Sequence, residues 1–284
     1  MSIRCLDLDT PPHLPALYAH AAARRKITGS TLPEQGVRCW VAVDPKPLAA
    51  FRKLCGLTPS PLLPPTYPHL LAFGLQMQLL TAKDFPFPLL GLIHLNNRIQ
   101  LIRPMGGVTE LHIGVYARNL QKHPKGATFE VVTEVSDRIG PLWAAESTLL
   151  CKGVELPGET LEQPTAATLA LTELTRWYVP SGIGRQYAKV SGDYNPIHLS
   201  AASAKLFGLP SAIAHGLWIK ARALAALDSH LPADNLDICV SFKKPVRLPS
   251  EVILLASDPG SRGDFQLNGQ GDLVHLTGQW RPLG

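Results

Sequence analysis

The sequence has 284 residues, of which 45% are hydrophobic and 17% charged, so it can fill one large core or two cores of about 140 residues each. So low a share of charged residues excludes a disordered chain. The net charge is +5, but the densest basic groups are only the runs at 24–26 and 243–244, so no nucleic-acid partner is expected.

Composition also argues against export, membrane insertion and metal binding. No stretch approaches about 18 uninterrupted apolar residues, and no signal peptide is recognised. The five cysteines are scattered and never form Cys-x-x-Cys pairs, which favours reduced thiols in a cytoplasmic protein over disulfides or zinc. No nucleotide-binding glycine loop is present, so neither a cofactor nor a metal is expected.

In the first half, a strand and a helix are expected before a loop that contains several prolines. An apolar helix follows, on which Leu70, Phe73, Met77 and Leu80 recur at helical spacing. Strands are then expected at 91–103, 110–117, 128–136 and 142–151. The next segment, 152–168, is polar, contains proline and glycine and lacks periodicity, which predicts a linker.

The second half repeats this order of elements. A helix is expected at about 213–227, with apolar side chains on one stripe. The strand at 238–242 is expected to pair with one that runs from 246 into 251–256, and the strand at 265–267 with that at 274–280. The pattern predicts an α+β protein with two similar domains, 1–151 and 169–284, joined by the linker 152–168.

A degenerate repeat supports this division. Residues 51–56 mirror residues 187–192 at a constant offset of 136, which sets Leu57 and Leu62 against Asp193 and His198. The first half therefore carries neither acid nor base in this loop and is predicted to be catalytically silent.

A second anchor sets His69 against His215 at an offset of 146. The first half would then lack about ten residues in the region of 203–208, a short helix that Gly208 is expected to end. Extra space beside the first apolar helix would follow.

The loop of the second half carries a carboxylate, Asp193, and an imidazole, His198, five residues apart. Pro196 lacks an N–H and disfavours the α region for Asn195, which predicts an extended, non-helical turn. Two titratable groups on a rigid loop can converge on one water. Gly216 then opens an apolar helix, where a bare N–H can stabilise an oxyanion.

The stretch 187–204 resembles the hydratase-2 motif of the MaoC-like dehydratases, which hydrate trans-2-enoyl thioesters to (R)-3-hydroxyacyl thioesters. Every position of that motif is matched, by Tyr187, Val190, Ser191, Gly192, Asp193, Asn195, Pro196, Ile197, His198 and Ala204. The resemblance implies a double hot-dog fold, in which each half wraps an antiparallel sheet around a central helix. It also implies that the first half accommodates the acyl chain.

The resemblance further implies roles for individual residues. Asp193 and His198 would bind the water and move its protons, although which is the acid and which the base stays open. The Gly216 N–H would receive the oxyanion, and Asn195 would support the loop. Tyr187 and Ser191 would pack around the site, and His215 would fix the loop before the helix. Lys243 and Lys244, at a strand bend, are weaker candidates for contacts to the pantetheine and phosphates of the carrier.

The function implied is reversible, (R)-specific hydration of trans-2-enoyl-CoA to (R)-3-hydroxyacyl-CoA in fatty-acid metabolism, by a monomer with an internal pseudo-dimer or by a homodimer. The alternatives are a 3-hydroxyacyl-ACP dehydratase of fatty-acid synthesis, a hydratase for a branched, dicarboxylic or secondary-metabolite thioester, and a non-catalytic acyl-thioester-binding subunit. A hot-dog thioesterase is disfavoured because such enzymes lack the Asp-x-Asn-Pro-x-His string.

Overall fold

The computed structural model describes residues 4–158, 160, 170–232 and 234–283, and most of the predicted linker lies outside them. The chain forms two compact units. The N-terminal unit consists of Met1–Val43, Leu71–Asn97 and Val108–Ala166, and the C-terminal unit of Asp44–Leu70, Arg98–Gly107 and Ala167–Gly284. Each unit is thus discontinuous in sequence: two segments of the first half belong to the unit that contains the second half. The predicted division of function between the two halves stays a prediction.

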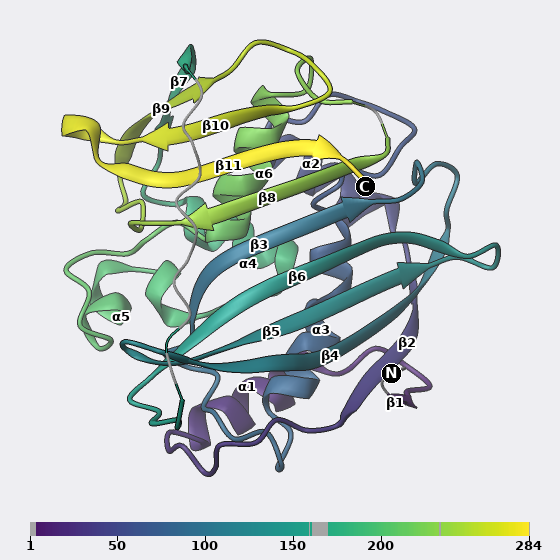
Figure 1. The fold of residues 1–284 in the computed structure, drawn as a ribbon, viewed down its shortest axis with the longest axis vertical. Helices are drawn as coiled ribbons and strands as arrows, with labels where there is room; N and C mark the ends of the chain where they lie inside the picture. The colour runs from purple at the N-terminus through teal and green to yellow at the C-terminus, as the bar shows by residue number, and fades with distance from the viewer. Residues whose placement is uncertain (1–3, 159, 161–169, 233, 284) are drawn as a thin grey trace. The chain divides into compact units, whose positions relative to one another are not determined.

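The N-terminal unit contains five strands that are hydrogen-bonded in the order β1-β2-β4-β5-β6 (Figure 1). Its strands are β1 (Arg4–Asp7), β2 (Gln35–Ala42), β4 (Glu110–His123), β5 (Gly126–Ser136) and β6 (Pro141–Lys152). The first pair is parallel and the others are antiparallel. Helix α1 (Leu14–Ala23) also belongs to this unit, whereas α3 (Pro68–Leu80) and β3 (Ile93–Leu101) cross the division between the units.

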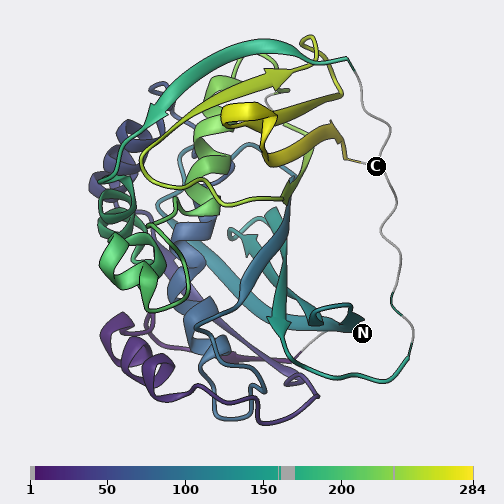
Figure 2. The ribbon, with the colours of Figure 1, turned by 90° about the vertical axis from the view of Figure 1, so that its left-hand side faces the viewer.

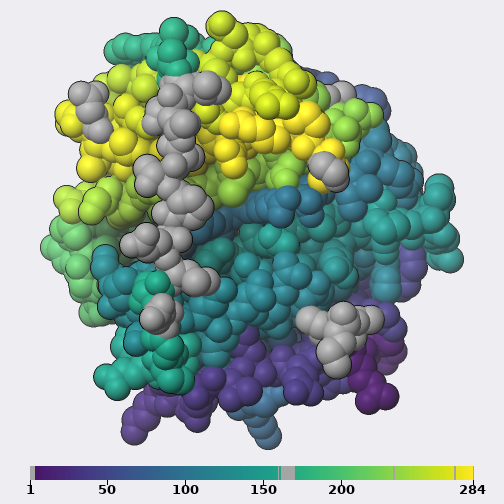
Figure 3. Space-filling view, in the orientation of Figure 1, coloured from purple at the N-terminus to yellow at the C-terminus, as the bar shows by residue number. Residues whose placement is uncertain are grey.

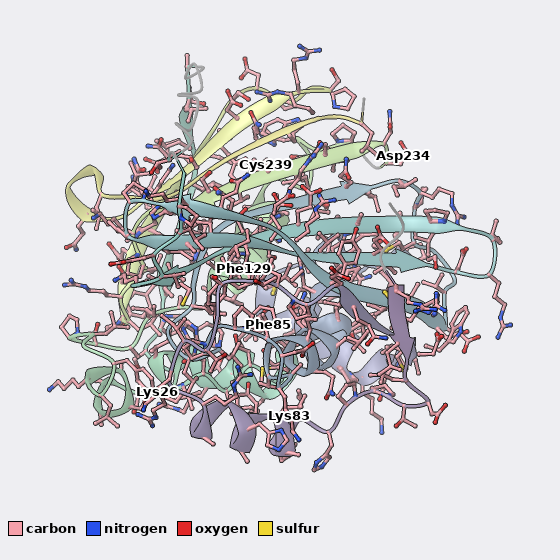
Figure 4. All side chains as sticks on the ribbon, turned by 60° about the horizontal axis from the view of Figure 1, so that its bottom comes forward. Lys26, Lys83, Phe85, Phe129, Asp234 and Cys239 are labelled. Carbon is pink, nitrogen blue, oxygen red and sulfur yellow. The ribbon has the colours of Figure 1, made fainter. Side chains whose placement is uncertain are left out.

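Aromatic packing fills part of the core of the N-terminal unit. Phe85 and Phe129, both labelled in Figure 4, have ring centroids 5.5 Å apart, and the Phe87 ring lies 5.4 Å from that of Phe129. All three side chains are fully buried. The helix predicted from the spacing of Met77 and Leu80 is confirmed as α3.

The C-terminal unit contains five antiparallel strands that are hydrogen-bonded in the order β7-β9-β10-β11-β8. Its strands are β7 (Thr172–Val179), β8 (Leu236–Phe242), β9 (Ser250–Ala256), β10 (Gly263–Asn268) and β11 (Val274–Pro282). Figure 2 shows α6 (Gly216–Ala226), in green, on one side of these strands, and β11, in yellow, lies on the surface in Figure 3.

One predicted strand pairing is confirmed and the other is wrong. The strands at 265–267 and 274–280 pair as β10 and β11. The strand at 238–242, now β8, instead pairs with β11, while β9 pairs with β7 and β10. The intervening residues 243–249 do not form a hairpin turn, because they run alongside the segment before α6: the N–H of Ala214 donates to Val246 O (2.9 Å). Because of this pairing, α6 begins at Gly216 and not at about 213, where the helix was expected.

Three further helices of the C-terminal unit place the loop 192–215, which carries the candidate catalytic residues and is called the catalytic loop below. They are α2 (Pro45–Cys55), α4 (Ile183–Ser191) and α5 (Ala201–Lys205), and α2 packs against α4. The short helix α5 confirms that a helix lies in this region, but the predicted end at Gly208 is wrong: α5 ends at Lys205 with Leu206 as its C-cap, and the left-handed Gly208 (φ 77°) follows in a turn. None of the described helices is long and apolar enough to cross a membrane.

Candidate active site

The catalytic loop begins where α4 ends. Gly192 adopts the left-handed conformation (φ 79°) that ends the helix, and its N–H donates to Ala188 O. The Ser191 hydroxyl donates to Tyr187 O (2.8 Å) and accepts the N–H of Asp193 (3.1 Å). Ser191 thus fixes the direction in which the chain leaves α4.

Asp193 and Asn195 hold the loop through their own backbone neighbours. One carboxylate oxygen of Asp193 accepts the Asn195 N–H (3.1 Å), and Asn195 caps a 3₁₀ turn, Pro196–His198, by accepting the Ile197 N–H. The prediction of an extended turn throughout is therefore wrong at its end. Proline lacks only an N–H that the first residue of a helical turn does not use, so it can begin this one.

His198 is held in one tautomer. Its Nδ1 lies 2.8 Å from Ile213 O, and because a carbonyl oxygen can only accept, Nδ1 carries the proton. In the neutral ring Nε2 is then an acceptor, available to a water. Burial lowers the pKa of His198, while Asp193 and the Ile213 carbonyl oppose the shift, so the ring is neutral at neutral pH.

His215 contacts both Asp193 and His198, the candidate catalytic groups. Its ring stacks on that of His198 (centroids 3.7 Å apart, planes at 28°) and contacts the buried Tyr187 ring at 4.8 Å. Its Nε2 donates to the backbone oxygen of Asp193 (3.0 Å). Burial, reinforced by His198, lowers the pKa of His215 to about 3, so it is neutral and fixes the loop, as expected from sequence.

The side chains of Asp193, His198 and His215 also meet a distance criterion for metal binding, with potential ligand atoms within 4.8 Å of one another. Their geometry fits a metal poorly. Stacked rings direct their nitrogen lone pairs alongside each other rather than toward one point, and Nε2 of His215 already donates to a carbonyl. The absence of a metal stays a prediction.

Gly216 is the first residue of α6, where the helix dipole is positive. Among the described residues, no acceptor pairs with its N–H. A Cβ at this position would lie 3.1 Å from the ring of Phe242, so the glycine leaves room between that ring and the helix start. This donor belongs to the residue next to His215, which stacks on His198.

Lys243 and Lys244 follow Phe242 on the segment that passes the start of α6. Both are exposed, and His275 fixes the backbone here, since its ring contacts Lys244 O (3.0 Å) and its carbonyl accepts the Lys243 N–H (2.9 Å). Among the described residues neither lysine forms an ion pair. Both side chains are therefore available to an anion.

Two contacts of the site were not found from sequence. The carbonyl of Ile213 sets the His198 tautomer, and a backbone atom has no signature in residue type. Gly184, within α4, lies so close to the loop that a Cβ there would be 1.8 Å from His198 O. A glycine inside a helix is the signal that could have identified it.

Comparison with known proteins places this geometry in a family. A model of the MaoC-like domain matches residues 155–278. The chain is 36% identical over 251 residues to 3-hydroxyacyl-thioester dehydratase X of Mycobacterium tuberculosis, covering 85% of this chain and 86% of that protein. The chain belongs to the MaoC-like dehydratase family.

Solved structures agree with this placement. The crystal structure of HtdX from Mycobacterium tuberculosis superposes with a TM-score of 0.75 at 33% identity, covering 87% of this chain and all of that one. A second Mycobacterium tuberculosis protein, described as having a double hot-dog fold, shares the fold at 13% identity (TM-score 0.55; 92% of this chain and 96% of that one). The predicted double hot-dog fold is thereby confirmed, and this MaoC-like dehydratase is a hydro-lyase.

Proposed function

We propose that this MaoC-like dehydratase adds water reversibly to trans-2-enoyl-CoA and forms (R)-3-hydroxyacyl-CoA. The observation that carries the proposal is the fixed tautomer of His198, which leaves Nε2 unprotonated in a side chain that clusters with the Asp193 carboxylate. Both groups can bind the same water: Nε2 accepts a hydrogen bond from one O–H of the water, and the carboxylate accepts one from the other O–H.

In the hydration direction, His198 takes a proton from the water as its oxygen bonds to C3. The π electrons of the double bond move toward the thioester carbonyl, which becomes an enolate oxygen. The unpaired N–H of Gly216, at the positive end of α6, is placed to stabilise this charge. Protonation of C2 by the proton taken from the water completes the addition.

The geometry supports addition of both hydrogen and hydroxyl to one face of the double bond. Asp193 and His198 lie on a single loop, and His215, the other titratable group within the cluster, is neutral and already donates to a backbone carbonyl. The same groups would run the dehydration in reverse. Lys243 and Lys244 are proposed to meet the phosphates of the carrier.

The test is an absorbance assay that follows loss of the enoyl thioester with C4, C8 and C12 enoyl-CoA, together with chiral analysis of the product. We expect turnover and (R)-3-hydroxyacyl-CoA. An (S) product would refute the proposed geometry. Matched enoyl-ACP substrates test the carrier-protein alternative: a kcat/KM far higher on them than on enoyl-CoA would favour it. No turnover with either carrier would favour a non-catalytic acyl-thioester-binding subunit.

A further inference from the structure

The C-terminal unit contains a pocket of about 610 Å³ that the proposed reaction does not use. Its walls come from α2, the end of β7, α4 and α6, all within this one unit. We call it the Lys–Arg pocket, after Lys53, Lys189 and Arg222, which line it. Its volume lies within the range of sites for small organic ligands.

The charges of the pocket are all of one sign. Lys53 from α2, Lys189 from α4 and Arg222 from α6 line it, and no aspartate or glutamate does. Within the part of the chain that the structure describes, none of these three cations forms an ion pair or a side-chain hydrogen bond. Three cations from three helices therefore converge on a cavity that lacks a counter-charge.

Arg222 is the most informative of the three because it is half-buried. Its guanidinium lies over the ring of Trp177, 4.8 Å from the centroid. Burial lowers its pKa, with Cys55 opposing the shift, so the charge is held at a cost in solvation. The end of α2 at Gly56 lies nearby and its carbonyls compensate about half a charge, which leaves a net positive site.

The rest of the lining is largely apolar. Trp218 forms part of the wall and is fixed in place by donating from Nε1 to Leu54 O (3.2 Å). Ile183 and Val190 add aliphatic surface from α4. A small hydrated anion such as free phosphate would leave this surface exposed to water, whereas a ligand with an apolar body would cover it.

We propose that the Lys–Arg pocket binds an amphipathic organic anion, that is, an apolar chain or ring that ends in a carboxylate or a phosphate. The anionic group would lie at Arg222 between the two lysines, and the apolar body against Trp218 and the aliphatic side chains of α4. This inference does not depend on the proposed reaction. The ligand would contact α4, which ends just before Asp193, and α6, which begins at Gly216.

Calorimetric titration of the full chain tests this with four probes: octanoate, octyl phosphate, 1-octanol and inorganic phosphate. We expect octanoate or octyl phosphate to bind, and the tighter of the two identifies the anionic group. Octanol lacks the charge and inorganic phosphate lacks the apolar body, so both should bind at least about tenfold more weakly. Added NaCl should weaken binding of the anions.

Variants locate the binding. Arg222→Gln should weaken binding of the better anion by about tenfold or more. The exposed pair Lys53→Gln/Lys189→Gln should also weaken it and avoids any folding defect of the Arg222 variant. Lys125→Gln, an exposed lysine of the N-terminal unit with the same change of charge, should leave it unchanged. The hydration assay distinguishes this pocket from the acyl site, because binding here should not compete with enoyl-CoA.

Several results would overturn the inference. They are failure of both anions to bind at millimolar concentration, equal binding of octanol or inorganic phosphate, affinities unchanged in the Arg222 and lysine variants, and purely competitive inhibition of hydration. The last two would assign any bound anion to the acyl-thioester site instead.

Discussion

The loop 56–67 after α2 and the loop 192–215 after α4 leave their helices in the same way. Gly56 and Gly192 both adopt the left-handed conformation, with φ of 67° and 79°. Both loops then return to pair with a later segment, since Leu63 N–H donates to Met105 O (2.9 Å) as Ala214 N–H does to Val246 O (2.9 Å). The repeat recognised in the sequence is thus a repeat of backbone structure.

The two loops differ in what holds them between these points. In the first loop, the guanidinium of Arg52 donates to the carbonyls of Thr58 (2.9 Å), Ser60 (3.0 Å) and Leu62 (2.5 Å). In the second, Asp193 and His198 make the corresponding contacts with the loop backbone and are also the candidate acid and base. The comparison teaches that the scaffold needs polar side chains at this turn but not these particular ones.

The largest expected effect comes from removing the chemistry of the second loop alone. Asp193→Asn and His198→Gln should each lower kcat for enoyl-CoA hydration by about 10²–10⁴-fold, because each removes one ligand of the reacting water. The double variant should be little worse than either single one, since both act on the same water. Steady-state kinetics on folded protein, checked by circular dichroism, measures this.

Leu57→Asn is the matched control, because it places asparagine at the corresponding position of the first loop. Its activity should stay within about twofold of the unchanged protein. Near-full activity in either second-loop variant, or a large loss in the control, would reverse the assignment of roles to the two loops.

Gly216→Val should lower kcat by about 10²-fold, because the side chain would crowd both the oxyanion donor and the ring of Phe242. The corresponding start of α3, Pro68, has no free N–H to lose. Combining Gly216→Ala with Phe242→Ala separates the two causes. Recovery of activity in that double variant, relative to Gly216→Ala alone, would identify the ring contact rather than the donor as the source of the loss.

Gly184→Ala by itself should lower kcat less than Gly216→Val does, by a factor of about ten to a hundred. Its Cβ would overlap with His198 O, so the catalytic loop would have to shift. Gly182→Ala, two residues earlier, is the control, since its Cβ would meet nothing closer than 3.8 Å. Equal kinetics for the two alanine variants would show that the loop can move without consequence.

The smallest expected effect concerns pH. In the folded protein the pKa of His198 and that of His215 both lie below the usual histidine value of 6.5, and that of His215 is about 3. The stability that the two neutral histidines contribute is therefore fully present above about pH 6.5 and is lost as the pH falls through the folded pKa. The free energy of unfolding decreases by about 1.4 kcal/mol per pH unit for each histidine that stays neutral in the folded protein. Urea unfolding at pH 7 and pH 5.5 measures it.

His215→Asn should flatten this pH dependence, because it removes the larger shift. The first loop offers the contrast: Tyr67 packs against Phe51 (centroids 5.4 Å apart) where His215 packs against Tyr187, and it does not titrate in this range. An unchanged slope in the His215 variant would assign the pH dependence to other groups.

Sequence reasoning anticipated much of this architecture because periodicity and turn residues are local. The apolar helices, most strands and the α+β class followed from such patterns. The alignment of His69 with His215 failed: Tyr67 makes the contact that His215 makes, since the first loop lacks α5 but is longer just before its helix.

The sequence by itself determined which residues are the candidates for the chemistry, because a matched string from Tyr187 to Ala204 places a carboxylate, an imidazole and a proline at fixed spacing. Only the tertiary structure decided how they work. The tautomer of His198 depends on the Ile213 carbonyl, fifteen residues away, and its pKa on burial. The pairing of β8 with β11 likewise depends on residues 243–249, which run alongside the segment before α6. Such contacts join groups that are distant in the chain, and their energies arise from distance and burial, which residue order does not specify.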